Sequence, residues 1–172
     1  MSKVITFSRN FPDTHPRKGE PTYFVEKIWK SLYDRQQPMI NGIPATDEGE
    51  INYSYFNKHL SELVAKKHTI RKGKRWKACD WFSPRVWSGK PYQSKMITIA
   101  PDMQLVRVVD FELHDTTVIF MDGTYWNHLY HRDTDVLAKN DGLNLIDFQN
   151  WISAKNTFSG QILIWQDVDL PY

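Results

Sequence analysis

The chain has 172 residues, of which 41% are hydrophobic and 24% are charged, and this composition is ordinary for one soluble globular domain. Its single cysteine, Cys79, excludes an internal disulfide framework and a cysteine-rich zinc site. No apolar run approaches the ~18 residues that cross a bilayer, and the N-terminus lacks the apolar stretch of a secretory signal. We therefore expect a cytoplasmic protein without a membrane partner.

The first part of the chain predicts one strand, a loop and two helices. Val4–Phe7 is β-branched and aromatic, as strands are, and the Pro- and Gly-bearing segment that follows predicts a loop. Apolar residues at helical spacing then predict helices over Thr22–Gln37 and roughly over Tyr53–Ala65. We expect the apolar stripes of both helices to pack into the core.

The rest of the chain predicts mainly strands. Asp122-Gly123 between apolar runs predicts a hairpin turn, because such turns need positive φ. Pro84 is expected to force an edge or a bulge, because proline cannot donate to a sheet ladder. The predicted strands are Trp81–Trp87, Met96–Ala100, Gln104–Leu113, Thr117–Met121, Thr124–His128 and Gln161–Trp165.

Two short helices are expected late in the chain. Asp133 or Thr134 begins the first, and Asn144, with Asp147 three residues later, begins the second. Grouped strands with segregated helices predict an α+β fold. Mostly antiparallel strands of this length predict a small, curved or barrel-like sheet.

Positive charge is concentrated between Lys66 and Lys77, where seven Lys or Arg residues stand without an acid. The whole chain has 22 Lys and Arg against 20 Asp and Glu, so its formal net charge of +2 depends on this stretch. Such a stretch predicts a polyanion ligand. The alternative is a solvated basic turn.

Within this stretch lies Lys66-x-x-Thr69-Ile70-Arg71. In an extended segment Thr69 and Arg71 would share a face, and Ile70 would point to the core. Arg71 offers a planar donor fork that suits phosphate or a carbonyl edge. Lys66, partly desolvated near other cations, would have a lowered pKa and act as a base or nucleophile. On spacing alone, structural roles for Thr69 and Arg71 remain the alternative.

This motif and the residues after it resemble the ASCH domain, a small PUA-like β-barrel module associated with RNA and modified nucleosides. The family motif is Gly-x-Lys-x-x-Thr-x-Arg followed by Gly-Asp. Here Asp80 stands at the family Asp, and Val64 and Cys79 occupy the two glycine positions. The resemblance covers about residues 4–11 and 65–165. It implies one ASCH/PUA-like domain over residues 1–172, with residues 12–64 as a helical insertion.

Some small ASCH proteins are amidohydrolases that deacetylate N4-acetylcytidine, and this chain resembles them at the motif and the opening strand. The resemblance implies a catalytic set of Lys66, Thr69 and Asp141, although the characterised enzymes have a Glu at the position of Asp141. Lysine would activate the threonine hydroxyl or a water, and the acid would orient or share the proton. A local turn role for Asp141 before Gly142 is the alternative.

A wider set of residues is expected to bind the ligand, because cations interleaved with aromatic rings suit stacked bases and their phosphates. Core or edge packing is the alternative for the rings. The histidines form no motif of fixed spacing that would predict a metal site, so we expect neither a metal nor another cofactor. Cys79 is expected to be a small buried residue. The expected ligand-binding residues are Arg71, Arg9, Lys72, Lys74, Arg75, Trp76 and Trp87.

Three functions follow from these patterns. The first is an RNA- or modified-nucleoside-binding domain with a basic cleft on Lys66, Thr69 and Arg71. The second is an amidohydrolase that deacylates a modified base such as N4-acetylcytidine. The third is a protein-interaction module that uses the two inserted helices. The sequence predicts no oligomeric state.

Overall fold

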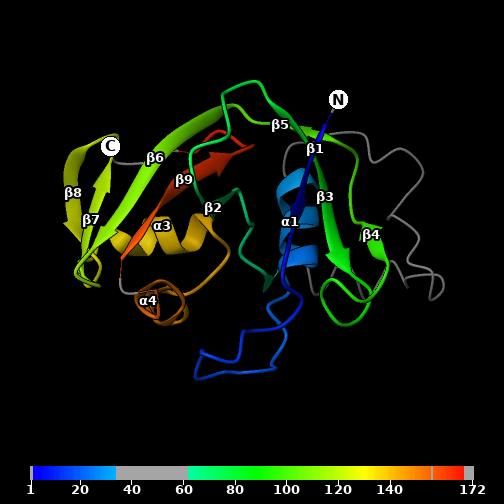
Figure 1. Cartoon of the computed structure of the whole chain (residues 1–172), viewed down its shortest axis with the longest axis horizontal. Coiled ribbons are helices and arrows are strands. Elements are labelled where there is room, and N and C mark those ends of the chain that lie inside the picture. Colours follow the sequence, from blue (N-terminus) through cyan, green and yellow to red (C-terminus); the bar gives the residue numbers. More distant parts are fainter. Residues whose placement is uncertain (1, 34–61, 156, 169–172) are drawn as a thin grey trace.

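The computed structural model describes residues 2–33, 62–155 and 157–168. These residues form an α+β fold of two sheets, mostly antiparallel, with helices beside them (Figure 1). The α+β class that the sequence predicts is therefore confirmed. The helices are α1 (Phe24–Tyr33), α3 (Thr134–Asn140) and α4 (Leu145–Ser153).

The first sheet is built around β3 (Trp81–Trp87), which has neighbours on both sides. β1 (Lys3–Thr6) pairs with it in parallel, whereas β4 (Met96–Thr98) and β5 (Met103–Gln104) pair with it antiparallel. The prediction that Pro84 forces an edge or a bulge is wrong as to the edge, because β3 is the central strand. The antiparallel ladder is interrupted at Pro84, between its pairings with β5 and β4, and the Pro84 carbonyl accepts from Ile99 N at 3.0 Å.

The second sheet has the order β2 (His68–Lys72), β9 (Phe158–Ile164), β6 (Arg107–His114), β7 (Val118–Met121) and β8 (Thr124–His128). All of its neighbouring strands are antiparallel. Asp122 and Gly123, between β7 and β8, have φ values of 50° and 77°, so the predicted hairpin turn is confirmed.

The two sheets do not close into a barrel, so the prediction of a PUA-like β-barrel is wrong. On one side the chain passes between the sheets at Leu105 and Val106, whose N–H groups donate to the carbonyls of Asp80 and Ile164. On the other side β1 and β2 share no ladder. A guanidinium lies between them instead, because Arg71 Nη2 donates to the Thr6 carbonyl at 2.8 Å.

One apolar core joins the sheets and helices. α1 contributes Phe24 and Ile28 to it, and its Trp29 Nε1 donates to the Ile99 carbonyl beside β4. α4 begins as predicted, because the Asn144 side chain accepts a hydrogen bond from Asp147 N at 2.7 Å. Every helix among the described residues is too short or too polar to cross a bilayer.

The predicted helices near the N-terminus are only partly described. α1 is described as far as Tyr33, and residues 34–37 of the predicted first helix lie outside the described residues. Residues 53–61 of the second predicted helix also lie outside, and Val64 and Ala65 belong to no helix. Cys79 is exposed with φ 68°, so its predicted burial is wrong; it lies in the turn that leads into β3.

Candidate functional site

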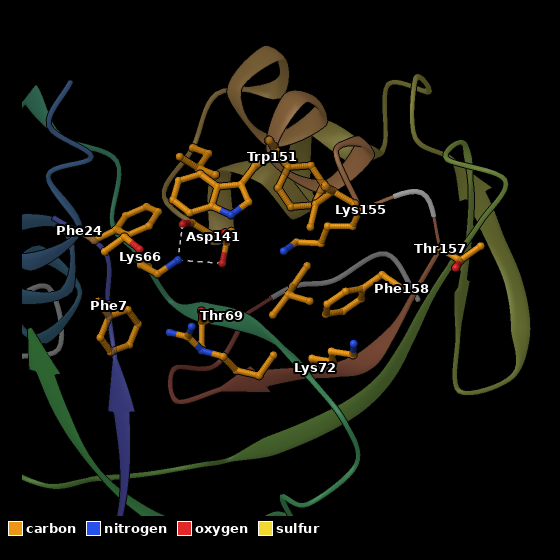
Figure 2. A pocket seen from close by; sticks show the side chains of 16 residues that line it. Phe7, Phe24, Lys66, Thr69, Lys72, Asp141, Trp151, Lys155, Thr157 and Phe158 are labelled. Carbon is orange, nitrogen blue, oxygen red and sulfur yellow. Dashed lines mark hydrogen bonds and ion pairs between the residues drawn. The ribbon is translucent and has the colours of Figure 1, made fainter. Parts of the chain in front are cut away.

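A cavity of about 400 Å³ lies among the end of β1, strand β2, the segment after α3, and α4 with the residues that follow it (Figure 2). It brings together four predicted residues of the basic stretch and the distant Asp141. Its lining residues are Phe7, Ser8, Phe24, Lys66, Thr69, Ile70, Arg71, Lys72, Asp141, Leu143, Phe148, Trp151, Ile152, Lys155, Thr157 and Phe158.

The backbone around Lys66 is held by three elements. Lys66 N donates to the Lys27 carbonyl in α1 at 2.9 Å, and Lys67 N donates to the Asn140 carbonyl at the end of α3 at 2.8 Å. The Lys67 carbonyl accepts from Trp165 N, just after β9, at 3.2 Å. Because the segment is anchored on three sides, the Lys66 side chain enters the cavity from a fixed position.

Lys66 and Asp141 form a buried ion pair at one end of the cavity. Lys66 Nζ donates to Asp141 Oδ1 at 2.7 Å and to the Asp141 carbonyl at 2.5 Å, and it lies 4.1 Å from the centroid of the Phe24 ring. Their side chains are only 1% and 13% exposed.

Burial acts on the two charges of this pair in opposite directions. It lowers the pKa of Lys66 to about 8, and the carboxylate of Asp141 limits that fall. It raises the pKa of Asp141 above its ordinary value, against the influence of Lys66. The two pKa values therefore approach each other, which makes proton transfer through the pair less costly than between the same groups in water.

The turn after α3 places Asp141 against Lys66. Asp141 is the C-cap of α3, and Gly142 follows with φ 75°. A Cβ at Gly142 would lie 3.0 Å from Lys66 Cβ, so glycine is required both by the backbone angle and by the close approach. Lys27 Nζ donates to the Gly142 carbonyl at 2.7 Å and holds the turn from α1. Asp141 thus has the turn role and also faces the cavity.

Strand β2 supplies Thr69, Ile70, Arg71 and Lys72 to the cavity wall. Thr69 is buried, and Arg71 lies 5.2 Å from the Phe7 ring with a buried Nε that has no hydrogen-bond partner among the described residues. Burial lowers the pKa of Arg71 to about 10. Ile70, expected to point to the core, packs partly against it and also lines the cavity.

His68 is a buried neighbour of the ion pair that the sequence did not indicate. Its Nδ1 lies 3.6 Å from Asp141 Oδ1, and neither ring nitrogen has a hydrogen-bond partner of good geometry among the described residues. Burial, followed by the charge of Lys66, lowers its pKa well below its ordinary value, so the ring is neutral. The neutral ring therefore does not compete with Lys66 for an ion pair with the Asp141 carboxylate.

Two further lining residues, Trp151 and Lys155, were also missed as site residues. Trp151 was interpreted only as part of the apolar face of its helix, and Lys155 follows directly after α4. Their spacing of four residues was the available signal, because such positions lie next to each other where a helix, or a last turn that continues it, includes both.

Five of the expected ligand-binding residues do not line the cavity. Trp76 is 3% exposed in the core, where its ring lies edge-on to Phe82. Gln161 holds it there: Trp76 N donates to Gln161 Oε1 at 3.0 Å, and Gln161 Nε2 donates to the Trp76 carbonyl at 3.2 Å. Arg75 lies outside the core over the same ring, 5.7 Å from its centroid.

The other three residues of this group form surface contacts. Lys74 pairs with Asp110 at 2.8 Å, and Arg9 donates to the Ser88 carbonyl at 3.2 Å. Trp87 contacts Tyr92 with 5.3 Å between ring centroids. The basic stretch is therefore divided, since its first part enters the cavity and its second part lies on the surface around a buried tryptophan.

No group of three or more His, Cys, Asp or Glu side chains within the described ranges could hold a metal ion. The Lys66 end of the cavity instead holds one ammonium and one carboxylate, both largely buried. No protein-family model, curated protein or solved structure matches this chain.

Proposed function

We propose that this protein is an amidohydrolase that removes an acyl group from the exocyclic nitrogen of a nucleobase, as in N4-acetylcytidine. The observation that carries the proposal is the Lys66–Asp141 pair, 2.7 Å apart and buried at a cavity that Thr69 also lines. Titratable groups with environments that shift their pKa values are typical of acid–base sites.

The proposed reaction adds one water across the acyl C–N bond and releases a carboxylic acid and the free amino base. Water attacks the acyl carbon as the Lys66–Asp141 pair accepts its proton, and the pair returns a proton to the leaving nitrogen. Alternatively the Thr69 hydroxyl attacks first, and water then hydrolyses the ester on Thr69. The positive charge of Arg71 favours the oxyanion that develops on the acyl oxygen.

The walls of the cavity suit a planar base. Phe24, Phe148 and Trp151 line it, and aromatic rings are the usual partners of an unstacked base. Apolar walls also exclude water, which strengthens the electrostatic effect of nearby charges.

The resemblance to the ASCH domain points the same way. Cys79, which stands at a family glycine, has φ 68°, in the left-handed region that favours glycine. A glycine-like backbone at this position supports the alignment of the motif, and with it the assignment of Lys66 and Thr69 to the site.

The test is incubation with N4-acetylcytidine, followed by chromatography for cytidine and acetate. We expect turnover by the natural chain, and its loss in Lys66→Ala, Asp141→Asn and Thr69→Val. Lys90→Gln, which removes an exposed lysine from the loop between β3 and β4, is the control that should keep full turnover. Undiminished turnover in folded Lys66→Ala and Asp141→Asn would rule out this site.

A second candidate function is binding of RNA or a modified nucleoside without hydrolysis. It is favoured by the charge of the lining, which has Lys66, Arg71, Lys72 and Lys155 against one acid, Asp141. In that case an RNA oligonucleotide binds without chemical change, and its affinity falls as salt rises, because bound counterions are released. An affinity that does not change with salt would contradict this function. The third function depends on the two inserted helices, and residues 34–37 of the first and 53–61 of the second lie outside the described residues.

A further inference from the structure

Three cations of the cavity lack a carboxylate partner among the described residues. Lys72 and Lys155 form no ion pair there, and Arg71 bonds only to the Thr6 carbonyl, with its buried Nε unpaired. Asp141 is the one acid in the lining, and its carboxylate is bonded to Lys66. The three cations therefore form a group of positive charge that no carboxylate among the described residues pairs with.

Lys72 and Lys155 lie in the part of the cavity away from the ion pair, whereas Arg71 is within electrostatic reach of both the ion pair and Lys155. Lys72, at the end of β2, and Lys155, just after α4, reach into the cavity from opposite walls (Figure 2). Lys155 N donates to the Ile152 carbonyl at 3.1 Å, which continues the last turn of α4 and fixes the root of this side chain. Figure 2 shows Lys66 and Asp141 beside Phe24, with Lys72 and Phe158 farther along the same cavity.

The three charges lie close enough to repel one another. Burial lowers the pKa of Lys155, and the charges of Arg71 and Lys72 lower it further. Holding like charges together in a partly desolvated cavity costs free energy, and a bound anion would offset this repulsion. The planar fork of Arg71 and the flexible ammonium groups of the two lysines are the donors that bind phosphate in proteins.

We propose that Arg71, Lys72 and Lys155 form a phosphate subsite, so that a nucleotide or a nucleotide unit of RNA binds in preference to the free nucleoside. This inference rests on the proposed function for the identity of the base, which lies at the Lys66–Asp141 end. The phosphate then occupies the cationic end and sets the direction in which the ligand enters the cavity.

Calorimetric titration at low salt tests this with cytidine, cytidine 5′-monophosphate, cytidine 3′-monophosphate and the dinucleotide CpC. We expect the phosphorylated ligands to bind at least about tenfold more tightly than cytidine, as one or two charge-assisted hydrogen bonds provide. Tighter binding of a monophosphate alone identifies a terminal phosphate, and tighter binding of CpC identifies the RNA backbone.

Lys72→Gln and Lys155→Gln should each weaken nucleotide binding more than cytidine binding, and the preference should decline as salt rises. Lys90→Gln is the matched control, since it removes one exposed positive charge outside the cavity lining and should leave the preference unchanged. Inorganic phosphate should raise the melting temperature of the natural chain more than that of Lys155→Gln.

Equal affinity of the natural chain for cytidine and all three phosphorylated ligands would overturn the subsite, as would equal stabilisation of both chains by phosphate. A hydrolysis assay with N4-acetylcytidine and with its 5′- and 3′-monophosphates separates this inference from the proposed function. Phosphate preference without turnover of any of these three compounds supports the subsite and contradicts the hydrolase. Turnover without phosphate preference supports the hydrolase and contradicts the subsite.

Discussion

Replacing Asp141 with asparagine keeps the size of the side chain but removes the negative charge that faces the Lys66 ammonium. The Asn oxygen can still accept the hydrogen bond that now measures 2.7 Å, so the change isolates the electrostatic part of the interaction. Both partners are nearly inaccessible, which leaves an ammonium in the cavity with little water to stabilise it.

Removing one partner of a buried pair costs about 3–5 kcal/mol of unfolding free energy. We expect a loss of about 3 kcal/mol, at the low end of that range, because burial already raises the pKa of Asp141 and so part of its charge is costly to the folded state. The pKa of Lys66 should fall below its present value of about 8, because Asp141 is the group that opposes desolvation.

The assay is equilibrium unfolding in urea, at pH 7 and pH 9, for the natural chain and Asp141→Asn. The loss should be smaller at pH 9, where the unpaired lysine is neutral in the folded variant. Asp135→Asn is the matched control, because Asp135 and Lys139 are 2.6 Å apart on the exposed surface of α3. Exposed pairs contribute at most about 1 kcal/mol. Equal losses in the two variants would refute the argument that burial makes the Lys66–Asp141 pair costly to break.

Two further outcomes follow from the same region. The pKa of Lys66 is about 8 in the folded state, against 10.5 for an unperturbed lysine. Between these two pH values the unfolded chain binds more protons than the folded chain, so Lys66 favours folding increasingly as pH rises from 8 to 10.5. The stability difference between the natural chain and Lys66→Met should therefore shift toward the natural chain between pH 8 and 10.5 in chemical unfolding; a difference independent of pH contradicts the assignment. Gly142→Ala should cost at least about 1–2 kcal/mol, since φ is 75° and the new Cβ would lie 3.0 Å from Lys66 Cβ. Gly123→Ala, with φ 77° and no atom within 4 Å, should cost less, and equal melting temperatures for the two variants would exclude the close approach as the cause.

Local features of the fold could be predicted because each depends on neighbouring residues. The strands predicted over Trp81–Trp87 and Thr124–His128 match β3 and β8 residue for residue. The Asn144 cap and the hairpin turn were also found, since a cap and a turn are formed by a few consecutive side chains and backbone angles. The barrel closure that the sequence predicted is wrong, because closure depends on pairing between strands far apart in the chain, which local patterns do not determine.

The sequence alone determined that Thr69 and Arg71 share one face of an extended strand and that Lys66 precedes them, within the one concentration of positive charge. Tertiary structure decided which of these charges face a cavity. Asp141 meets Lys66 across 75 residues because the end of α3 bonds to the segment before β2, and Lys155 joins them from α4. Trp76, in the same basic stretch, goes to the core because Gln161 binds both of its backbone polar groups. Burial and long-range backbone hydrogen bonds, which no local pattern encodes, thus separate the charges of the site from those of the surface.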